Sequence, residues 1–394
     1  MKILTRQTLV LSTGAFIVML GLSLVVPILP LYARQFGVSR TAAGALVSSF
    51  AVARLVFDVA GGVLADRYGA RRVMLVGAWV LILSSIGAAL APSYGILLVT
   101  RVLEGVGSAA FATSANQLIV IATPSAVLGR TMAVYQTGIL AGISIGPIVG
   151  GKAAELGDFR TPFWIYAALG LAVVVLVVRF VERGEPQGRT LRQVFATART
   201  VLRRPAFLAL MFVAMVIFIM RAGASLTLLP LYAGEELGFG ETDIGIVIAA
   251  AAAVNVLVVN PGGWLVDRIG RRPVLVMGLV LTAVATAAIG FLDTFASLVV
   301  LSAASGVAGA LASIPPPTLA GDLAPDGAAG VAVGLYRSAG DVGLIVGPLI
   351  VGVAADADAF QAGFVLVGGL LVIAAIVASF IPETRHGNPA RTTE

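Results

Sequence analysis

The chain alternates between long apolar runs and short polar connections. Each run is about 20 residues long or longer, which is the length that a helix needs to cross the hydrocarbon core of a bilayer. Membrane barrels are built instead from strands of about ten residues with alternating polarity. The pattern therefore predicts an all-α membrane protein with twelve transmembrane helices. The predicted spans are 8–33, 43–65, 73–91, 96–121, 131–154, 163–181, 206–233, 243–266, 273–292, 297–319, 331–354 and 361–382.

The composition agrees with this prediction and excludes several classes of protein. Of the 394 residues, 59% are hydrophobic and 12% are charged, whereas soluble domains have about 45–50% and about 25%. There is no cysteine, and the one histidine, His386, lies in a polar tail. A disulfide frame, a metal site and a Ser-His-Asp centre are therefore not expected. No glycine-rich stretch carries the Lys-Ser/Thr of a phosphate loop, so we expect neither an enzyme nor a bound cofactor.

The first apolar run follows a short polar segment that contains Lys2 and Arg6, an arrangement also found in secretory signal peptides. The run is too long for such a peptide, however. Pro27 and Pro30 also stand where small residues would form the cleavage site. We interpret the run as a first span that the protein retains.

The positions of the basic residues predict the orientation of the spans. An even number of spans places both termini on one side, and 18 of the 26 Lys and Arg residues fall in the tails and loops of that side. Four lie in the opposite loops and four inside the spans. Cytoplasmic loops are enriched in Lys and Arg, so we expect both termini in the cytoplasm and a multi-pass protein of the inner membrane. The net charge of +6 then reports topology and does not indicate a nucleic-acid partner.

The sequence also repeats itself at an offset of about 201 residues. The repeat predicts two six-helix halves, 1–181 and 205–394, joined by an amphipathic cytoplasmic linker, 182–204. Transporters built in this way bind substrate near the membrane midplane between their halves. The matching segments are GGVLADRYGARR (61–72) with GGWLVDRIGRRP (262–273), YQTGILAGISIGP (135–147) with YRSAGDVGLIVGP (336–348), and LPLYA (29–33) with LPLYA (229–233).

Three groups of residues resemble signatures of the major facilitator superfamily, and within it of the twelve-span drug:proton antiporters. One is the loop motif between spans 2 and 3, one is Arg101 with Gly105 in span 4, and one is the glycine pattern of span 5. The resemblance implies the major facilitator fold, two pseudo-symmetric six-helix bundles. The loop residues are Gly62, Leu64, Asp66, Arg67, Gly69, Arg71 and Arg72, and the span 5 residues are Gly138, Gly142, Gly146, Pro147, Gly150 and Gly151.

The loop motif and its repeat have a physical interpretation as a conformational latch. A carboxylate such as Asp66 is stabilised by about 0.3–1 kcal/mol at an exposed helix N-terminus, and we expect it to face the start of span 11. The alternative is a short turn whose charges only set orientation. The residues of the predicted latch are Gly62, Asp66, Arg67, Gly69, Arg71, Asp267, Arg268 and Arg272.

The span 5 glycines recur every four residues and so share one helix face. Small residues allow helices to approach closely in lipid, and Pro147 removes a backbone hydrogen bond and bends the helix. This suits a helix at the interface between halves that move. Generic small-residue packing is the alternative.

Seven charged residues fall inside the predicted spans, where a charge is costly unless it is paired or faces water. The spacings allow three pairs along single helices, and mutual neutralisation is the alternative to a functional role. Arg101 occupies the position of the span 4 arginine that related exporters use in proton coupling, and no acid stands in span 1. The candidate proton-coupling residues are therefore Asp341, Glu104, Asp58 and Arg101.

Arg221 has no acid nearby in the sequence and needs a partner from elsewhere, such as Asp341, Glu104 or an anionic substrate group. Tyr32 and Tyr232 lie at span ends, where aromatic residues commonly anchor a protein at the membrane interface. Polar residues within the spans are candidates for a substrate cavity. The predicted substrate-binding residues are Arg221, Arg337, Asn116, Gln117, Gln136, Asn255, Tyr135 and Tyr336.

These observations together predict a monomeric secondary exporter that links multidrug efflux to the proton gradient. Protons and a small, lipophilic or cationic organic molecule are its expected partners, together with the lipid bilayer. The alternative is a metabolite transporter of the same fold, for a sugar, an organic acid or an amine. A receptor without transport activity would lack proton-linked flux, and the chain has no large polar domain with which to signal.

Overall fold

The computed structural model describes residues 6–123, 125–181, 198–325 and 328–384. Within these ranges, only the backbone is described at some helical positions, Gly62 and Asp66 among them. In this described part, twelve helices are long and apolar enough to cross a membrane. The predicted all-α membrane fold is confirmed. Most of the predicted linker, 182–204, lies outside the described residues, and the predicted domain boundaries stay a prediction.

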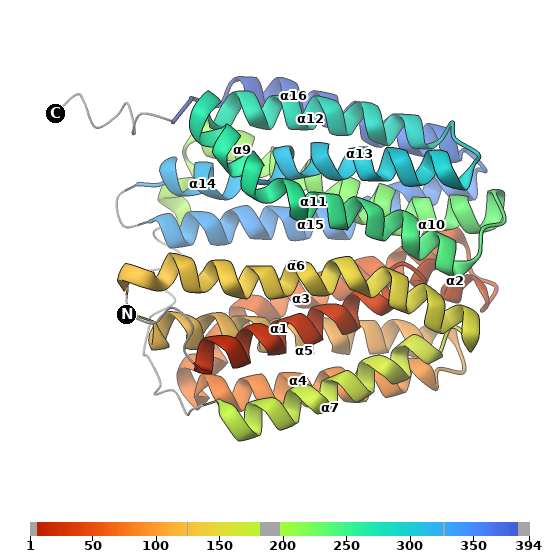
Figure 1. The fold of residues 1–394 in the computed structure, drawn as a ribbon, viewed down its shortest axis with the longest axis horizontal. Helices are drawn as coiled ribbons and strands as arrows, with labels where there is room; N and C mark the ends of the chain where they lie inside the picture. The colour runs from red at the N-terminus through yellow and green to blue at the C-terminus, as the bar shows by residue number, and fades with distance from the viewer. Residues whose placement is uncertain (1–5, 124, 182–197, 326–327, 385–394) are drawn as a thin grey trace. The chain divides into compact units, whose positions relative to one another are not determined.

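Contacts divide the chain into two units, which are described separately. Unit 1 comprises 1–189 with 233–249, and unit 2 comprises 190–232 with 250–394. The first half of the chain forms α1 (Arg6–Val25), α2 (Leu29–Arg34), α3 (Arg40–Tyr68), α4 (Ala70–Ala89), α5 (Tyr94–Ala122), α6 (Ser125–Leu156) and α7 (Thr161–Phe180) (Figure 1).

The second half contains shorter elements besides its long helices. They are α9 (Pro205–Ile219), η1 (Met220–Leu228), α10 (Leu229–Leu231), η2 (Tyr232–Glu236), α11 (Glu241–Ile269), α12 (Arg271–Ile289), α13 (Phe295–Ser313), α14 (Pro315–Asp322), α15 (Ala329–Asp356) and α16 (Phe360–Ser379). The predicted span 206–233 is interrupted, because η1 and η2 are π-helices. The predicted span 297–319 is also divided, because α13 ends just before the proline triplet and Pro315 begins α14.

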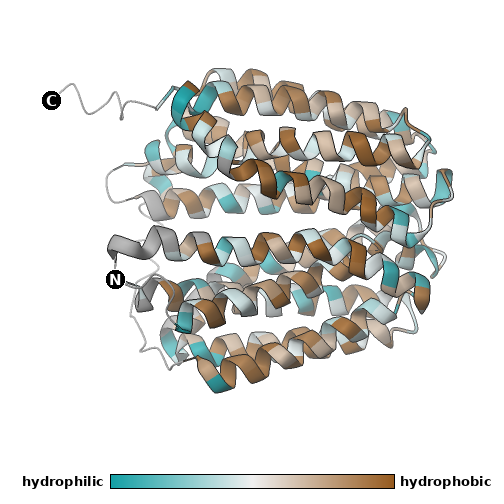
Figure 2. Cartoon of the chain, in the orientation of Figure 1, coloured by the Kyte–Doolittle hydropathy of each residue, from teal (hydrophilic) through white to brown (hydrophobic). Residues whose placement is uncertain are grey.

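The apolar side chains follow the pattern expected of helices in lipid. Large hydrophobic residues such as Leu83, Val175 and Val284 are each at least 60% exposed in the middle of long helices. Figure 2 shows hydrophobic residues along the helices and hydrophilic residues gathered mainly toward helix ends. Exposing these side chains to water would be unfavourable in a soluble protein, whereas the hydrocarbon core of a bilayer solvates them.

The repeated LPLYA segments form the same buried aromatic cluster in each unit. The ring of Tyr32 lies 5.7 Å from that of Phe163, and the ring of Tyr232 lies 5.7 Å from that of Phe364. The hydroxyl of Tyr32 donates to the carbonyl oxygen of Ala88, and that of Tyr232 donates to carbonyls at the end of α12. The prediction that both tyrosines are interface anchors is therefore wrong, since they are only 2% and 4% exposed.

Glycines allow α1 and α6 to pack backbone to backbone in unit 1. A Cβ added at Gly142 would lie 2.6 Å from the carbonyl oxygen of Phe16, and one at Gly150 would lie 2.0 Å from that of Leu24. Gly138 and Gly146 contact α1 in the same way. Four of the six predicted span 5 residues thus serve close packing within one bundle. The two others meet α11, because Gly151 lies against Glu241 and the Pro147 carbonyl lies against Gly245.

Candidate functional site

A buried ion pair lies on one face of α5. Arg101 and Glu104 are three residues apart and Ser108 follows after four, so the helix places all three side chains on the same side. Arg101 Nη1 donates to Glu104 Oε2, and both residues are only 1% exposed. On the other side, the Arg101 guanidinium carbon lies 5.0 Å from the centre of the Phe50 ring of α3. The predicted pairing along the helix is confirmed, and it is fully buried.

Tyr166 of α7 belongs to the same surroundings. It is 1% exposed, and the charges of both Glu104 and Arg101 act on its phenol group. Its ring occupies the space beside Gly21 of α1, where an added Cβ would lie 2.0 Å from the ring atom Cδ2. Sequence analysis did not find Tyr166, because nothing in its own span marks it. The signal that existed was Gly21, whose missing side chain makes room for the ring.

The second predicted pair is weaker. Arg54 Nε and Asp58 Oδ2 of α3 lie 3.6 Å apart, and their side chains are 29% and 31% exposed. An ion pair at this exposure contributes little, about 0–1 kcal/mol.

Gly105 fixes the distance between α3 and α5, because an added Cβ would lie 2.4 Å from the carbonyl oxygen of Phe50.

In unit 2 the candidate charges lie on α15 and η1. Asp341 is buried, whereas Arg337 one turn earlier is exposed. Arg221 is exposed as well, and it lies in the first turn of η1. π-Helical segments are rare and are frequent at functional sites. Tyr336 is 7% exposed, and the charges of Arg337 and Arg221 both act on it.

The structure gives the predicted polar substrate residues different surroundings. Asn116 donates to the carbonyl oxygen of Ala112 in its own helix at 2.9 Å, and Asn255 donates to that of Gly306 at 3.3 Å. Tyr135 is buried, Gln117 is half-buried and Gln136 is exposed. Their role in substrate binding stays a prediction.

In the first loop motif, Gly69 joins α3 to α4 with φ +89°. Side chains rarely adopt this left-handed conformation, which explains the glycine. Arg71 Nη2 donates to the carbonyl oxygen of Val178 in the last turn of α7, at 2.6 Å. Arg67 lies over the ring of Tyr68 at 5.4 Å. Only the backbone of Gly62 and Asp66 is described, so the role of the Asp66 carboxylate in the predicted latch stays a prediction.

The repeated motif in unit 2 has the same construction. Gly270 has φ +112° between α11 and α12, and Arg272 Nη1 donates to the carbonyl oxygen of Ser379 in the last turn of α16, at 3.5 Å. Arg268 lies over the ring of Trp264 at 5.1 Å, and Asp267 is exposed. In each unit, therefore, the last arginine of the predicted latch binds the end of the last helix.

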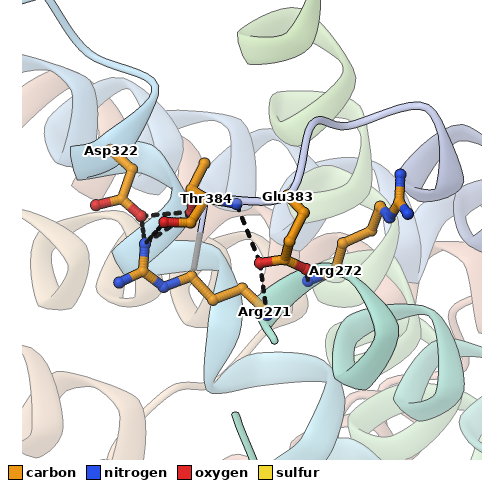
Figure 3. A network of polar contacts seen from close by, with 5 residues as sticks. All are labelled: Arg271, Arg272, Asp322, Glu383 and Thr384. Atoms are coloured by element: carbon orange, nitrogen blue, oxygen red, sulfur yellow. Dashed lines mark hydrogen bonds and ion pairs between the residues drawn. The ribbon is translucent and has the colours of Figure 1, made fainter. Parts of the chain in front are cut away.

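Unit 2 adds a polar network that sequence analysis missed (Figure 3). The Glu383 carboxylate accepts hydrogen bonds at 3.0 Å from the backbone N–H groups of Arg271 and Arg272, which begin α12. The Arg271 guanidinium donates to Thr384 Oγ1 at 2.7 Å and pairs with Asp322 at the end of α14. The segment after α16 thus joins α12 to α14. Its signal was an acid directly after the last span.

Unit 1 contains a second cluster of charges that sequence analysis missed. Arg34 Nε and Arg40 Nε donate to different oxygens of Glu235, at 2.8 Å and 2.7 Å. Glu155 of α6 accepts from Lys152 at 3.2 Å and from the hydroxyl of Thr242 in α11. Segment 233–249 therefore joins unit 1 through ion pairs and hydrogen bonds that only the folded chain brings together.

Comparisons with known proteins agree with this architecture. The family model of the Major Facilitator Superfamily matches residues 11–260 and 211–394. The quinolone resistance protein NorA of Staphylococcus aureus (strain MRSA252) is 25% identical over 256 residues, which cover 64% of this chain and 65% of NorA. The matched part is thus less than two thirds of that relative.

Two further likenesses extend over nearly the whole chain. An uncharacterized MFS-type transporter of Methanocaldococcus jannaschii, MJ1560, is 24% identical over 363 residues, 90% of this chain and 92% of the relative. A bacterial homolog to the human lysosomal transporter Spinster, solved in an inward-facing and unoccupied conformation, has a TM-score of 0.82 at 18% identity. That match covers 95% of this chain and 96% of the solved chain and shows the fold alone. The chain belongs to the Major Facilitator Superfamily, and it is a multi-pass membrane protein.

Proposed function

We propose that the protein is a proton-coupled exporter of small, lipophilic or cationic organic molecules that works by alternating access between its two halves. The observation that carries the proposal is the Arg101–Glu104 pair, in which two charges are 1% exposed within a span. Removing two charges from water costs free energy. A carboxylate in such a pair gains or loses a proton when its distance to the arginine changes. The name of NorA, a quinolone resistance protein, supports efflux.

Proton entry supplies the free energy in this proposal. One elementary charge that crosses 100 mV releases about 2.3 kcal/mol, which sustains a concentration ratio of roughly fifty-fold per charge. Glu104, Asp341 and Asp58 are the candidate proton carriers. The positive charges of Arg101 and Arg221 change how readily these acids bind a proton. The protein acts as a monomer in the inner membrane with both termini in the cytoplasm, and it needs no cofactor other than the proton gradient.

The loop motif acts as a latch in this mechanism, closing one side of the transporter while the other is open. An Asp66→Asn variant is therefore expected to fold and to bind substrate normally, but to transport it more slowly. Unchanged turnover in this variant would contradict the latch.

A second candidate function is the transport of an anionic metabolite such as an organic acid. Arg221 and Arg337 are both exposed in spans of unit 2, and an exposed guanidinium suits bidentate binding of a carboxylate or phosphate. This function predicts that anions compete for transport and that lipophilic cations do not.

Flux into proteoliposomes with an imposed pH gradient tests both functions. The full chain is reconstituted, and uptake is followed for a lipophilic cation, a neutral drug, a sugar and an organic anion. Uptake of the cation driven by the gradient supports the first proposal, and uptake of the anion supports the second. If no substrate moves with the gradient and none collapses it, the proposal of an antiporter is wrong.

A further inference from the structure

The Arg101–Glu104 site contains polar atoms that the pair itself does not use. Arg101 Nε, Glu104 Oε1, Ser108 Oγ and the Tyr166 hydroxyl are buried without a hydrogen-bond partner among the described residues. Each belongs to a side chain that is at most 2% exposed. Buried polar groups in native proteins almost always have a partner, from the protein or from water. Three of these side chains share one face of α5, so their unpartnered atoms mark a polar site around the ion pair.

The Tyr166 ring lies at the level of Glu104. Gly14 of α1 packs against Phe111 of α5, and these helices are the first and fourth spans, so they run in opposite directions. Gly21, seven residues after Gly14, therefore lies beside the turn of α5 that holds Glu104, seven residues before Phe111. The Tyr166 ring fills the space beside Gly21. The hydroxyl is the ring's one polar atom and carries both a donor and an acceptor. It is therefore able to donate a hydrogen bond toward a charged carboxylate and to accept one from a neutral carboxyl group.

The Phe50 ring completes the site by giving Arg101 a second partner. At 5.0 Å, the guanidinium lies within the range of a cation–π contact. A proton on Glu104 removes the negative charge that balances Arg101. The electron-rich ring face then remains against the cation, so protonation does not leave the guanidinium without a favourable contact.

Few other charges face this site. Gly105 brings α3 close, and the charged residues of α3 within its predicted span, Arg54 and Asp58, pair with each other. The helices α1 and α4 carry their charged residues in their first turns, far along the helix from the site. On α6, the titratable groups with described side chains are Tyr135 near its beginning and Lys152 and Glu155 near its end. Arg101 is the charged group that contacts Glu104 directly.

We propose that the Tyr166 hydroxyl and Ser108 hold a water molecule against the unpartnered carboxylate oxygen of Glu104, and that Glu104 exchanges its proton through this water. The Glu104 carboxylate takes the proton from a hydronium ion, which becomes water, and its ion pair with Arg101 becomes a hydrogen bond between a cation and a neutral acid. The reverse step returns the proton to water. Tyr166 and Phe50 are thus positioning residues. The inference rests on the proposed function only where it assigns this proton to transport.

A Tyr166→Phe variant tests the inference, because it removes the hydroxyl and keeps the ring against Gly21. Tyr32→Phe is the matched control, since Tyr32 is also a buried tyrosine of unit 1, but its hydroxyl donates to Ala88. The full-length proteins are reconstituted in proteoliposomes, and ethidium transport is measured as a function of pH. We expect Tyr166→Phe to move the pH of half-maximal transport upward by about one unit, with an unchanged KM for ethidium. Tyr32→Phe keeps the wild-type midpoint.

A second pair of variants reaches the same hydroxyl without removing it. Gly21→Ala places a methyl group where the Tyr166 ring lies, whereas Gly14→Ala on the same helix meets Phe111 at an ordinary 3.5 Å. We expect Gly21→Ala to reproduce the shift of Tyr166→Phe and Gly14→Ala to leave the midpoint unchanged. Because the two variants reach the hydroxyl by different routes, one still tests the inference if the other is too unstable to measure.

Infrared titration of the carboxyl band separates this inference from the proposed function. The band that disappears in Glu104→Gln is followed with pH in the purified protein, without substrate. If its midpoint moves in Tyr166→Phe and not in Tyr32→Phe, the inference holds, even if ethidium is not transported and the proposed function fails. An unchanged midpoint in Tyr166→Phe overturns the inference, whatever the result of the transport assay.

Discussion

Arg71 donates a hydrogen bond to the carbonyl oxygen of Val178, and the repeat mates of these two residues, Arg272 and Ser379, make the same contact in the other unit. The last carbonyl groups of a helix have no partner within the helix. An arginine from the loop motif supplies one, so the motif caps the last helix of its own half. Its arginines are therefore structural residues as well as candidates for the latch.

The cap predicts a specific loss of stability. Arg71→Ala removes the 2.6 Å hydrogen bond to α7 and is expected to cost about 1 kcal/mol. Arg72→Ala makes the same change of charge and size at an exposed neighbour and is the control. Thermal unfolding in detergent compares the two. Equal melting temperatures would show that the cap does not contribute.

The close packing of glycines predicts a contrast within α15. An added Cβ at Gly343 would lie 2.2 Å from the carbonyl oxygen of Met215 in α9, so Gly343→Ala forces the helices apart and is expected to cost about 1–3 kcal/mol. Gly334 has no atom within 4 Å of an added Cβ. Gly334→Ala should therefore leave stability unchanged or raise it slightly, because alanine favours helix. Thermal unfolding measures the stability of both variants. If Gly334→Ala loses as much stability as Gly343→Ala, helix packing is not the cause of the loss.

Two ion pairs of unit 1, Arg101–Glu104 and Arg54–Asp58, predict different costs for the loss of an acid. Glu104→Gln leaves the Arg101 charge buried without its counter-ion, which typically costs about 3–5 kcal/mol. Asp58→Asn disturbs a pair that is about 30% exposed and should cost less than about 1 kcal/mol. Chemical unfolding of the two variants measures the difference. A double variant, Arg101→Met with Glu104→Gln, should recover much of the lost stability, and failure to recover it would contradict an electrostatic origin.

The Glu383 network predicts a local change in hydrogen exchange. Glu383→Ala removes the acceptor of the Arg271 and Arg272 backbone N–H groups, and both amides should lose protection. The amide of Val73 lies in the first turn of the corresponding helix of unit 1, α4, and donates to the carbonyl oxygen of Gly69, so it should keep its exchange rate. Hydrogen exchange followed by mass spectrometry reports both regions. Unchanged protection at Arg271 and Arg272 would show that the carboxylate is not their effective partner.

Much of the fold was predictable because its determinants are local. Span length and hydropathy predict the twelve helices, and the repeat predicts that Gly69 and Gly270 occupy equivalent turns, where both adopt positive φ. The pairing of Arg101 with Glu104 follows from helical spacing alone. Tyr32 and Tyr232 show the limit of such reasoning. A tyrosine at a span end is an interface anchor or a core residue depending on which rings come to surround it, and those rings lie far along the chain.

The same limit applies to the sites that sequence analysis missed. Glu235 joins two arginines from about 200 residues earlier, and Glu383 joins the beginning of α12. Each of these contacts joins residues more than 100 positions apart, so no spacing rule detects it. Tyr166 differs again, because its burial beside Glu104 depends on a glycine in α1.

The sequence by itself determined that this is a twelve-span membrane protein with an internal repeat. The hydropathy of each span and the match between repeated segments are both properties of short stretches of chain, so they can be recognised without the fold. The sequence also determined which charges stand inside the spans. Only the tertiary structure decided what those charges touch. Burial, the Phe50 ring and the space beside Gly21 arise from helices that meet through long-range packing, and such packing leaves no periodic trace in the sequence.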